Sequence, residues 1–177
     1  MSEALEAELL RVAVRAAEQV APGRVDVVRD AGSWSDLPPR LNVLVTQSFD
    51  AGARAVVLVW PGVPRLRPDV ATAAVSDLAA GCDLVLGPMI QGGLYLMALR
   101  EPHPELFALP GEAWLSEDVM AFAGAARDMG LELGILQAER ALRSPADVRA
   151  ALADPLLPDD LRRLLSEFVP GSRHFVE

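Results

Sequence analysis

Apolar residues recur along the chain in two spacings, one typical of helices and one typical of strands. Between Ser2 and Ala21 they come every three or four residues, which predicts an amphipathic helix that ends at Pro22-Gly23. Residues 55–60 form instead a continuous apolar run of strand length, as expected of a strand covered on both faces. The same patterns predict further strands at 25–28, 83–86, 94–99 and 131–136, and further helices that begin near residues 41, 68, 116, 144 and 158.

The strands and helices alternate, with helices of 10 to 20 residues between most of the strands. This order predicts right-handed β-α-β units and therefore a mostly parallel sheet in a three-layer α/β/α sandwich. The chain contains no internal repeat and no linker. We therefore expect one α/β domain over residues 1–177.

The chain is apolar, with 51% hydrophobic residues and a mean hydropathy of +0.25. A surplus of apolar surface indicates a partner subunit, and we expect a homodimer. No apolar stretch approaches the ~20 residues that span a bilayer, and the acidic N-terminal helix is unlike a signal peptide. We therefore expect a cytoplasmic protein that does not bind membranes.

The charges are those of an acidic protein without lysine. The net charge is −9, and all 16 basic residues are arginines. Sites that depend on a lysine, such as a P-loop or a Schiff base, are therefore excluded. An acidic chain without a basic cluster is also a poor candidate for binding nucleic acid.

Cysteine and histidine do not form a metal-binding pattern here. Cys82 is the single cysteine, and His103 and His174 are the two histidines. Their spacing matches no zinc motif, so we expect no site of this kind.

Residues 83–100 are the most informative stretch. A strand ends in Gly87-Pro88, and the pair Gly92-Gly93 opens the next apolar run. Such a segment is typical of the lip of an active site at the end of a sheet. The two glycines serve either a turn that needs positive φ or a bound ligand, and the sequence leaves both readings open.

Six short motifs stand in order along the chain: residues 52–59 (GARAVVLV), 64–68 (PRLRP), 83–88 (DLVLGP), 91–96 (QGGLYL), 104–107 (PELF) and 144–148 (SPADV). Over residues 41–165 the chain resembles a bacterial family of glycosyltransferase-like proteins with the GT-A, nucleotide-diphospho-sugar transferase fold. That family is associated with radical-SAM and selenoprotein modules, and its relatives include guanylyltransferases of molybdenum-cofactor and 2-phospho-lactate metabolism.

The chain departs from this family at the positions that carry chemistry. The family's Ser-Asp-x-Pro matches Pro61-Gly62-Val63-Pro64 here, and its Asp-Gly-Gly matches Gln91-Gly92-Gly93. Its Asp-x-Asp-Thr-Pro matches Ala141-Leu142-Arg143-Ser144-Pro145. The resemblance also implies a first strand and a nucleotide-gripping loop that have no counterpart before Met1, so we expect a GT-A-type sheet with its first strand missing. Pairing in a homodimer, or insertion of residues 173–176, would cover the open strand.

The departures bear on cofactors and on the site. The aspartates of the family hold a divalent metal, and glycine and glutamine do not replace their charge. We therefore expect no metal and no cofactor, with Mg²⁺ or Mn²⁺ required only if transfer is retained. The bulk of Trp60 would fill part of the nucleotide pocket. No catalytic residue is assigned, and the candidate substrate-binding residues are Gly62, Pro88, Gln91, Gly92, Gly93, Glu112 and Trp114.

Three hypotheses follow from these observations. The chain is a degenerate transferase-like protein that binds a nucleotide or nucleotide sugar and acts as a binding or regulatory subunit. Alternatively, it is an active glycosyl- or nucleotidyl-transferase with a rearranged site. A misassigned start codon would account for the missing strand, but not for the lost aspartates.

Overall fold

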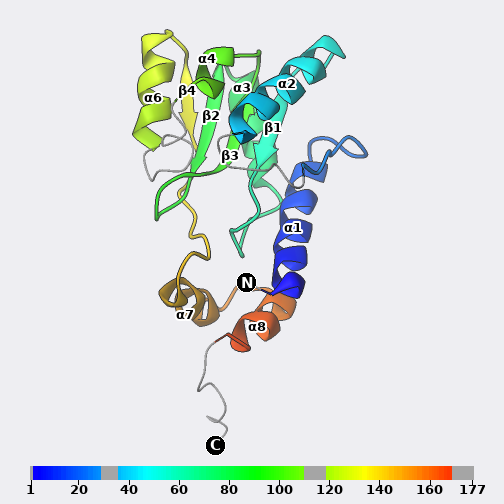
Figure 1. Ribbon diagram of the computed structural model, residues 1–177, viewed down its shortest axis with the longest axis vertical. Helices are drawn as coiled ribbons and strands as arrows, with labels where there is room; N and C mark the ends of the chain where they lie inside the picture. The colour runs from blue at the N-terminus through cyan, green and yellow to red at the C-terminus, as the bar shows by residue number, and fades with distance from the viewer. Residues whose placement is uncertain (1, 29–35, 110–118, 169–177) are drawn as a thin grey trace, which may run out of the picture.

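The computed structural model describes residues 2–28, 36–109 and 119–168, and it confirms the α/β class (Figure 1). Its sheet consists of β1 Val56–Val59, β2 Leu84–Pro88, β3 Leu94–Leu99 and β4 Leu133–Ile135. The helices of the described residues are α1 Glu3–Glu18, α2 Leu37–Asp50, α3 Val70–Ala79, α4 Pro104–Phe107, α6 Val119–Asp128, α7 Pro145–Ala153 and α8 Asp159–Ser166.

The sheet is mixed, with strand order β1-β3-β2-β4. β3 pairs antiparallel with both β1 and β2, whereas β2 and β4 pair in parallel. Three of the four strands run in one direction, as expected, and β3 is the exception. Only residues 89–93 separate β2 from β3, and a parallel return needs a crossover of about a dozen residues or more. β1, β2 and β4 nevertheless point the same way, so they end at one edge of the sheet, here called the carboxyl edge.

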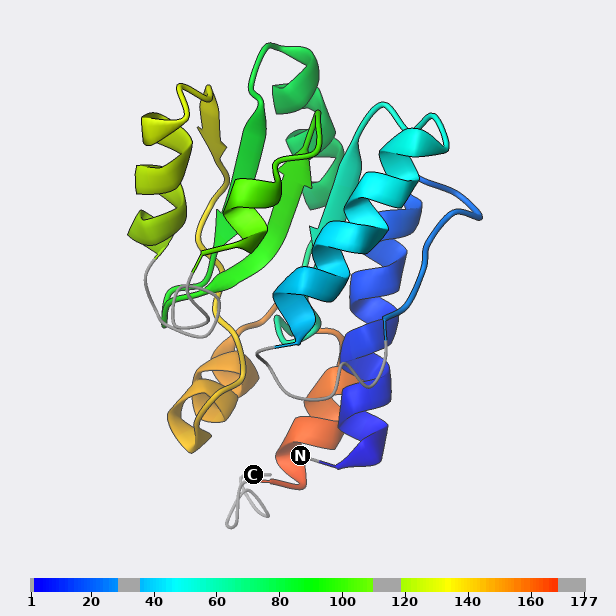
Figure 2. The ribbon, with the colours of Figure 1, turned by 45° about the horizontal axis from the view of Figure 1, so that its top comes forward.

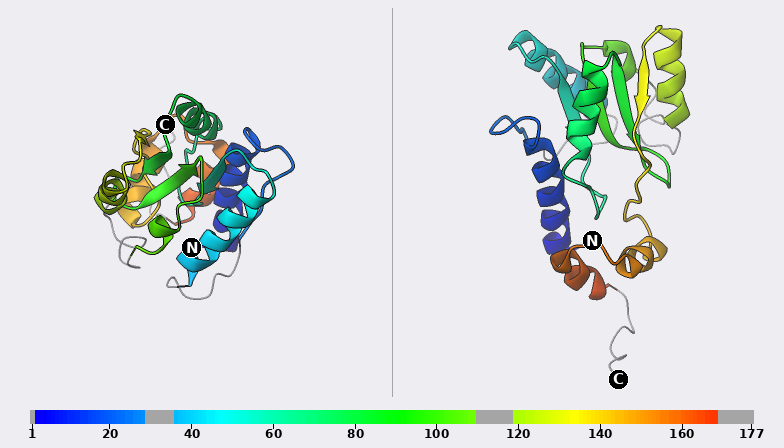
Figure 3. Two further views of the ribbon diagram at one scale, coloured as in Figure 1. Left: turned by 90° about the horizontal axis from the view of Figure 1, so that it is seen from above. Right: turned by 180° about the vertical axis from the view of Figure 1, so that it is seen from behind.

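Helices cover both faces of the sheet (Figures 2 and 3). Side chains of α1 and α3 pack on one face, where Val85 of β2 is buried. Those of α2, α4 and α6 pack on the other face, where Leu84 and Leu86 are buried. Neighbouring residues of β2 thus point to opposite faces, as the period of a strand requires. Every residue of β3 is buried, because strands flank it on both sides and helices cover both faces.

A third cluster lies below the carboxyl edge, where α7 and α8 pack beneath the sheet (Figure 1). Leu5 and Leu9 of α1 are buried there against Leu161 and Leu165 of α8. One turn or two further along, α1 buries Ala13 and Ala16 against the sheet. This helix of 16 residues therefore ties the lower helices to the sheet.

Two predicted helix starts are confirmed by their caps. The Ser2 hydroxyl accepts a hydrogen bond from the Leu5 backbone N–H at 3.3 Å, which opens α1. The Ser144 hydroxyl accepts one from the Asp147 backbone N–H at 3.3 Å, which opens α7. In each case a serine satisfies a donor that the first turn of a helix leaves free.

One predicted strand is absent. Residues 25–28 form no strand, although they are rich in valine, and Val27 is 42% exposed. A β-rich sequence becomes a strand only when a neighbour pairs with it and buries one face. The short helix α4 is not among the predicted helices, and its Pro104 stands at a first-turn position that suits proline.

Several predictions fall outside the described residues. The expected start of a helix at Ser116 lies there, as does the strand that residues 173–176 would add. The homodimer stays a prediction. None of the helices in the described ranges is long and apolar enough to cross a membrane.

One close contact in the sheet requires a glycine. A side-chain carbon at Gly87 would lie 2.6 Å from Cζ of Tyr95 and 3.0 Å from Cβ of Leu96. The Tyr95 ring is 1% exposed, and its hydroxyl donates to the Gln137 carbonyl at 3.0 Å. The ring is therefore held from both ends and cannot give way.

We expect Gly87→Ala to lower the free energy of unfolding by about 1–3 kcal/mol, because the new methyl group overpacks the core against Tyr95. Gly124→Ala is the matched control: Gly124 lies in α6 with no atom within 4 Å of the added carbon. That change should raise stability by about 0.5–1 kcal/mol, since alanine favours the helix. Urea unfolding of both variants measures the effects. Equal stability of Gly87→Ala and the wild type would contradict the packing argument.

Candidate functional site

Segments that the sequence singles out meet at the carboxyl edge. The Gly62 carbonyl, in the loop after β1, accepts a hydrogen bond from the Leu142 backbone N–H at 2.9 Å. The Pro88 carbonyl, at the end of β2, accepts one from the Glu139 backbone N–H at 3.0 Å. Residues 137–143, which follow β4, thus lie against the ends of both β1 and β2.

Gln91 lies in the turn between β2 and β3, and its side-chain amide is fully hydrogen-bonded. Its Nε2 donates to the Ala141 carbonyl at 2.8 Å and to Oδ1 of Asp147 at 2.7 Å. Its Oε1 accepts from the Ala141 backbone N–H at 3.1 Å. The amide therefore pairs with the backbone of Ala141 much as a neighbouring strand would. An ionised aspartate or glutamate has no N–H to supply either donated bond.

Asp147 is the buried charge of this site, with only 4% of its surface exposed. Oδ1 accepts from Gln91 Nε2 at 2.7 Å and from Arg140 Nη1 at 2.9 Å. Oδ2 accepts from the Ser144 hydroxyl at 2.7 Å and from the Arg143 backbone N–H at 3.3 Å. The Ser144 hydroxyl is the largest of the causes that hold the pKa of Asp147 well below its usual range, and Gln91 and Arg140 add to it. Asp147 and its four donors, Gln91, Arg140, Arg143 and Ser144, are called the Asp147 network.

The Gly92-Gly93 pair shapes the turn that carries Gln91. Their φ angles are +89° and +79°, in a region that residues with a side chain rarely adopt. A side-chain carbon at Gly93 would also lie 3.0 Å from Nη2 of Arg143. The conformation of the turn is thus a sufficient reason for both glycines, and a ligand role for them stays a prediction.

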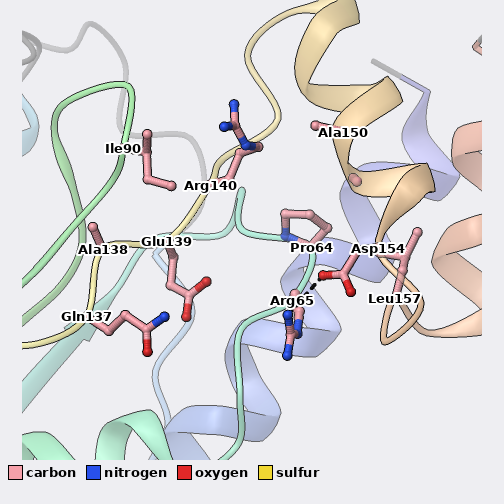
Figure 4. Close-up of a pocket in the computed structure, with 11 residues that line it drawn as sticks. Pro64, Arg65, Ile90, Gln137, Ala138, Glu139, Arg140, Ala150, Asp154 and Leu157 are labelled. Carbon is pink, nitrogen blue, oxygen red and sulfur yellow. Dashed lines mark hydrogen bonds and ion pairs between the residues drawn. The ribbon is translucent and has the colours of Figure 1, made fainter.

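A pocket of about 230 Å³ opens at the carboxyl edge, between the sheet and α7 (Figure 4). Its walls include Arg65 from the loop after β1, Ile90 from the turn after β2, residues 137–140 after β4, and Asp154 after α7. In open α/β sheets, ligands bind outside the carboxyl ends of the strands. The position of this pocket therefore makes it the candidate ligand site.

Glu139 differs from the other carboxylate of the pocket wall, Asp154, in having a raised pKa. Glu139 is half-buried, and burial raises the pKa of its carboxyl, although Arg65 and Arg67 oppose that effect. Arg65 itself forms an ion pair with Asp154 at 3.0 Å. Beneath the pocket, burial raises the pKa of Tyr95 to about 12, so its hydroxyl remains a neutral donor to the Gln137 carbonyl.

The side chains at this edge do not suit a magnesium or manganese ion. A carboxylate offers about four lone-pair sites, and all four of Asp147 are taken by donors. Gln91 spends its carbonyl oxygen on a backbone N–H, and Gly62 has no side chain. Among residues 2–28, 36–109 and 119–168, no three histidine, cysteine, aspartate or glutamate side chains cluster in a way that could hold a metal.

Five of the seven candidate substrate-binding residues lie together. Gly62, Pro88, Gln91, Gly92 and Gly93 all lie at the carboxyl edge, and the segment 141–145 joins them there. Glu112 and Trp114 lie outside the described residues. Trp60 packs against the face covered by α2, α4 and α6, and it does not line the pocket.

Sequence reasoning missed the charged residues of the site: Arg65, Glu139, Arg140, Asp147 and Asp154. A signal existed for Asp147, because it stands three residues after Ser144, where a carboxyl can reach back to the cap. For the others no local pattern distinguishes a pocket residue from an ordinary surface charge.

We expect Asp147→Asn to lower the free energy of unfolding by about 2–4 kcal/mol at neutral pH, because an amide N–H₂ would face donors of the network. The carboxyl of Asp147 loses its proton more easily in the folded than in the unfolded chain. Its contribution is therefore present above about pH 4 and is lost as the pH falls below that value.

Urea unfolding between neutral pH and about pH 3 checks this, and the difference between wild type and Asp147→Asn should narrow in acid. Asp128→Asn is the control, since its ion pair with Arg127 is exposed and should contribute less than about 1 kcal/mol. A difference that stays constant with pH would show that Asp147 does not act through its charge.

The fold is similar to that of a solved structure. A crystal structure from Desulfovibrio desulfuricans G20, described as a "putative nucleotide-diphospho-sugar transferase", superimposes with a TM-score of 0.69 at 24% sequence identity. The match covers 91% of this chain and 82% of that chain. The likeness confirms the expected nucleotide-diphospho-sugar transferase type of fold.

No curated protein matches the chain in sequence. The model of one protein family, DUF2064, matches residues 4–109, which is more than half of the 177 residues. That family is described as "Uncharacterized protein conserved in bacteria". The chain belongs to the DUF2064 family.

Proposed function

We propose that this protein binds a nucleotide or a nucleotide sugar at the carboxyl edge without metal-dependent transfer, as a binding or regulatory subunit. The observation that carries the proposal is the Asp147 network, in which every acceptor site of the buried carboxylate is occupied. A transferase that relies on Mg²⁺ or Mn²⁺ needs open carboxylate oxygens at such a site.

The residues around the network support the same proposal. Gly62, Gln91, Ala141 and Arg143 stand where the resemblance implies aspartates. Gln91 is engaged with Ala141 and Asp147, and Arg143 adds a positive charge beside Gly93. A cation approaching this point would meet a neutralised carboxylate and two arginines, which disfavours its binding.

The ligand class rests on two observations. The pocket lies at the carboxyl ends of β1, β2 and β4, where α/β folds bind their ligands. The fold is that of a structure described as a putative nucleotide-diphospho-sugar transferase. A nucleotide or nucleotide sugar is therefore the ligand to test first.

A panel of nucleotides and nucleotide sugars tests the proposal, with UDP, UDP-glucose, GDP, GDP-mannose and GTP as probes. We expect at least one of them to raise the melting temperature and to bind in calorimetry equally well with EDTA or with Mg²⁺. No nucleotide or pyrophosphate should be released. Arg65→Ala should weaken the binding of a nucleotide sugar, whereas Arg127→Ala, on the distant exposed end of α6, should not. Mg²⁺-dependent turnover would overturn the proposal, as would the absence of any binding.

A second variant tests whether the network excludes a further carboxylate. Gln91→Glu keeps the shape of the side chain but places a negative charge beside Asp147, where Nε2 now donates at 2.7 Å. We expect the free energy of unfolding to fall by about 2 kcal/mol or more at neutral pH, with partial recovery in acid as one carboxyl takes up a proton.

Excess Mg²⁺ should not restore the stability of Gln91→Glu if the edge is closed to metal. Gln137→Glu is the control, since its side chain lines the open pocket away from Asp147. Recovery of Gln91→Glu with Mg²⁺, measured as a shift of the melting temperature, would reveal a latent metal site and contradict the proposal.

The alternative function is active transfer by a rearranged site without metal. The observation that favours it is Glu139, a half-buried carboxyl with a raised pKa that lies in the pocket. Such a group is suited to general-base chemistry. Product release from the same panel in EDTA, lost in Glu139→Gln, would establish the alternative.

A further inference from the structure

Glu139 is held rigidly at the wall of the pocket. Its backbone N–H donates to the Pro88 carbonyl at 3.0 Å, and its carbonyl accepts from the Ile90 backbone N–H at 2.8 Å. The backbone of Glu139 thus continues the parallel pairing beyond β4, as its bridge to Met89 confirms. A side chain that starts from such a segment is well positioned for recognition.

The carboxylate of Glu139 projects into the pocket without a partner of its own. Figure 4 shows it on the same side as the Arg65 guanidinium, whose ion pair goes to Asp154 instead. Within the described part of the chain, no side chain donates a hydrogen bond to Glu139. A half-buried carboxylate in this state gains stability from any ligand that donates hydrogen bonds to it.

The charges of the walls argue against an anion in the pocket. The two arginines of the walls are already paired, Arg65 with Asp154 at 3.0 Å and Arg140 with Asp147 at 2.9 Å. An entering phosphate would have to compete for these guanidinium groups and would face the unpaired charge of Glu139. A neutral ligand that both donates and accepts hydrogen bonds meets no such cost.

The other residues of the pocket wall combine apolar surface with hydrogen-bonding groups, which suits a ligand ring that has an apolar face and polar edges. Pro64, Ile90, Ala150 and Leu157 supply apolar surface, and the side chain of Gln137 offers both a donor and an acceptor. The volume of about 230 Å³ lies below the range of about 300–1,000 Å³ that is typical of sites for drug-sized ligands. The pocket therefore has room for a single sugar ring but not for a whole nucleotide sugar.

We propose that this pocket is a monosaccharide subsite, in which Glu139 accepts hydrogen bonds from the hydroxyl groups of one sugar ring. Arg65 and Gln137 complete the polar contacts, and the apolar walls cover the C–H face of the ring. The proposal deepens the proposed function and rests on it, because the sugar would be the part of the ligand that enters the pocket. The nucleotide part would lie outside these walls.

Chemical-shift mapping with ¹⁵N-labelled protein tests the subsite. The probes are glucose, galactose, mannose and N-acetylglucosamine, each without a nucleotide. We expect at least one sugar to shift the amide resonances of Arg65 and of residues 137–140. Glu139→Gln should weaken the binding of that sugar by about tenfold or more, since its hydrogen bonds to a charged acceptor are lost.

Glu132→Gln is the matched control, because Glu132 is exposed and its backbone pairs with Asp83, just before β2 and away from the carboxyl edge. It should leave sugar binding unchanged. Glu139→Gln removes no hydrogen bond within the protein, so its melting temperature should equal or exceed that of the wild type. Sugar binding lost in a folded Glu139→Gln supports the subsite.

The subsite is overturned if no sugar shifts the resonances of the pocket, or if Glu139→Gln binds the sugar as well as the wild type does. Methylamine and inorganic phosphate are added as a cationic and an anionic probe, and binding of one of these alone would also overturn it. The nucleotide probes separate this failure from that of the proposed function. UDP or GDP binding without any sugar response would reject the subsite alone. A lack of response to both nucleotides and sugars would reject the proposed function and the subsite together.

Discussion

The carboxylate of Asp147 is the interaction on which the arrangement of this site depends. A buried carboxylate is costly unless each of its oxygens is bound, and here donors come from four places: the β2–β3 turn, the segment after β4, the cap of α7 and the backbone between them. None of these segments can move without exposing the charge to an incomplete set of donors. The network therefore sets the position of α7 relative to the sheet, and with it one wall of the pocket.

The same network explains why glutamine stands at position 91. The site requires a side chain that donates twice and accepts once, toward Asp147 and the backbone of Ala141. An amide meets this demand, whereas a carboxylate would add charge and remove both donors. Gln91 is thus specified by the hydrogen bonds that it makes within the protein.

Much of the architecture could be predicted from local patterns. Continuous apolar runs predicted β1, β2 and β3, the spacing of apolar residues predicted α1, and a helix start was predicted at Ser144, which caps α7. The antiparallel direction of β3 could also have been inferred, because residues 89–93 are too few for a crossover. The misassigned strand at 25–28 failed for another reason: its valines have β propensity, but no neighbouring strand pairs with them.

The candidate site was predictable only in part. The family resemblance singled out Gly62, Gln91 and the segment 141–145, and hydrogen bonds bring these residues together in the fold. Arg65, Glu139 and Asp154 are far apart in sequence, so their meeting depends on the register of the strands and on the docking of α7. Local sequence does not encode such a meeting.

The pairing of charges at the carboxyl edge has a consequence for specificity. Arg140 lines the pocket and also belongs to the Asp147 network, whereas Arg65 lines the pocket and is held by Asp154. The positive charge of each guanidinium group is therefore balanced by a carboxylate. Glu139 is the charged wall residue without a hydrogen-bond partner in the described structure, so the proposed subsite assigns the recognition of the ligand to it. A pocket wall with two paired arginines and one unpaired carboxylate favours a ligand that donates hydrogen bonds. A sugar ring donates them through its hydroxyl groups, and it carries no net charge that would have to be desolvated.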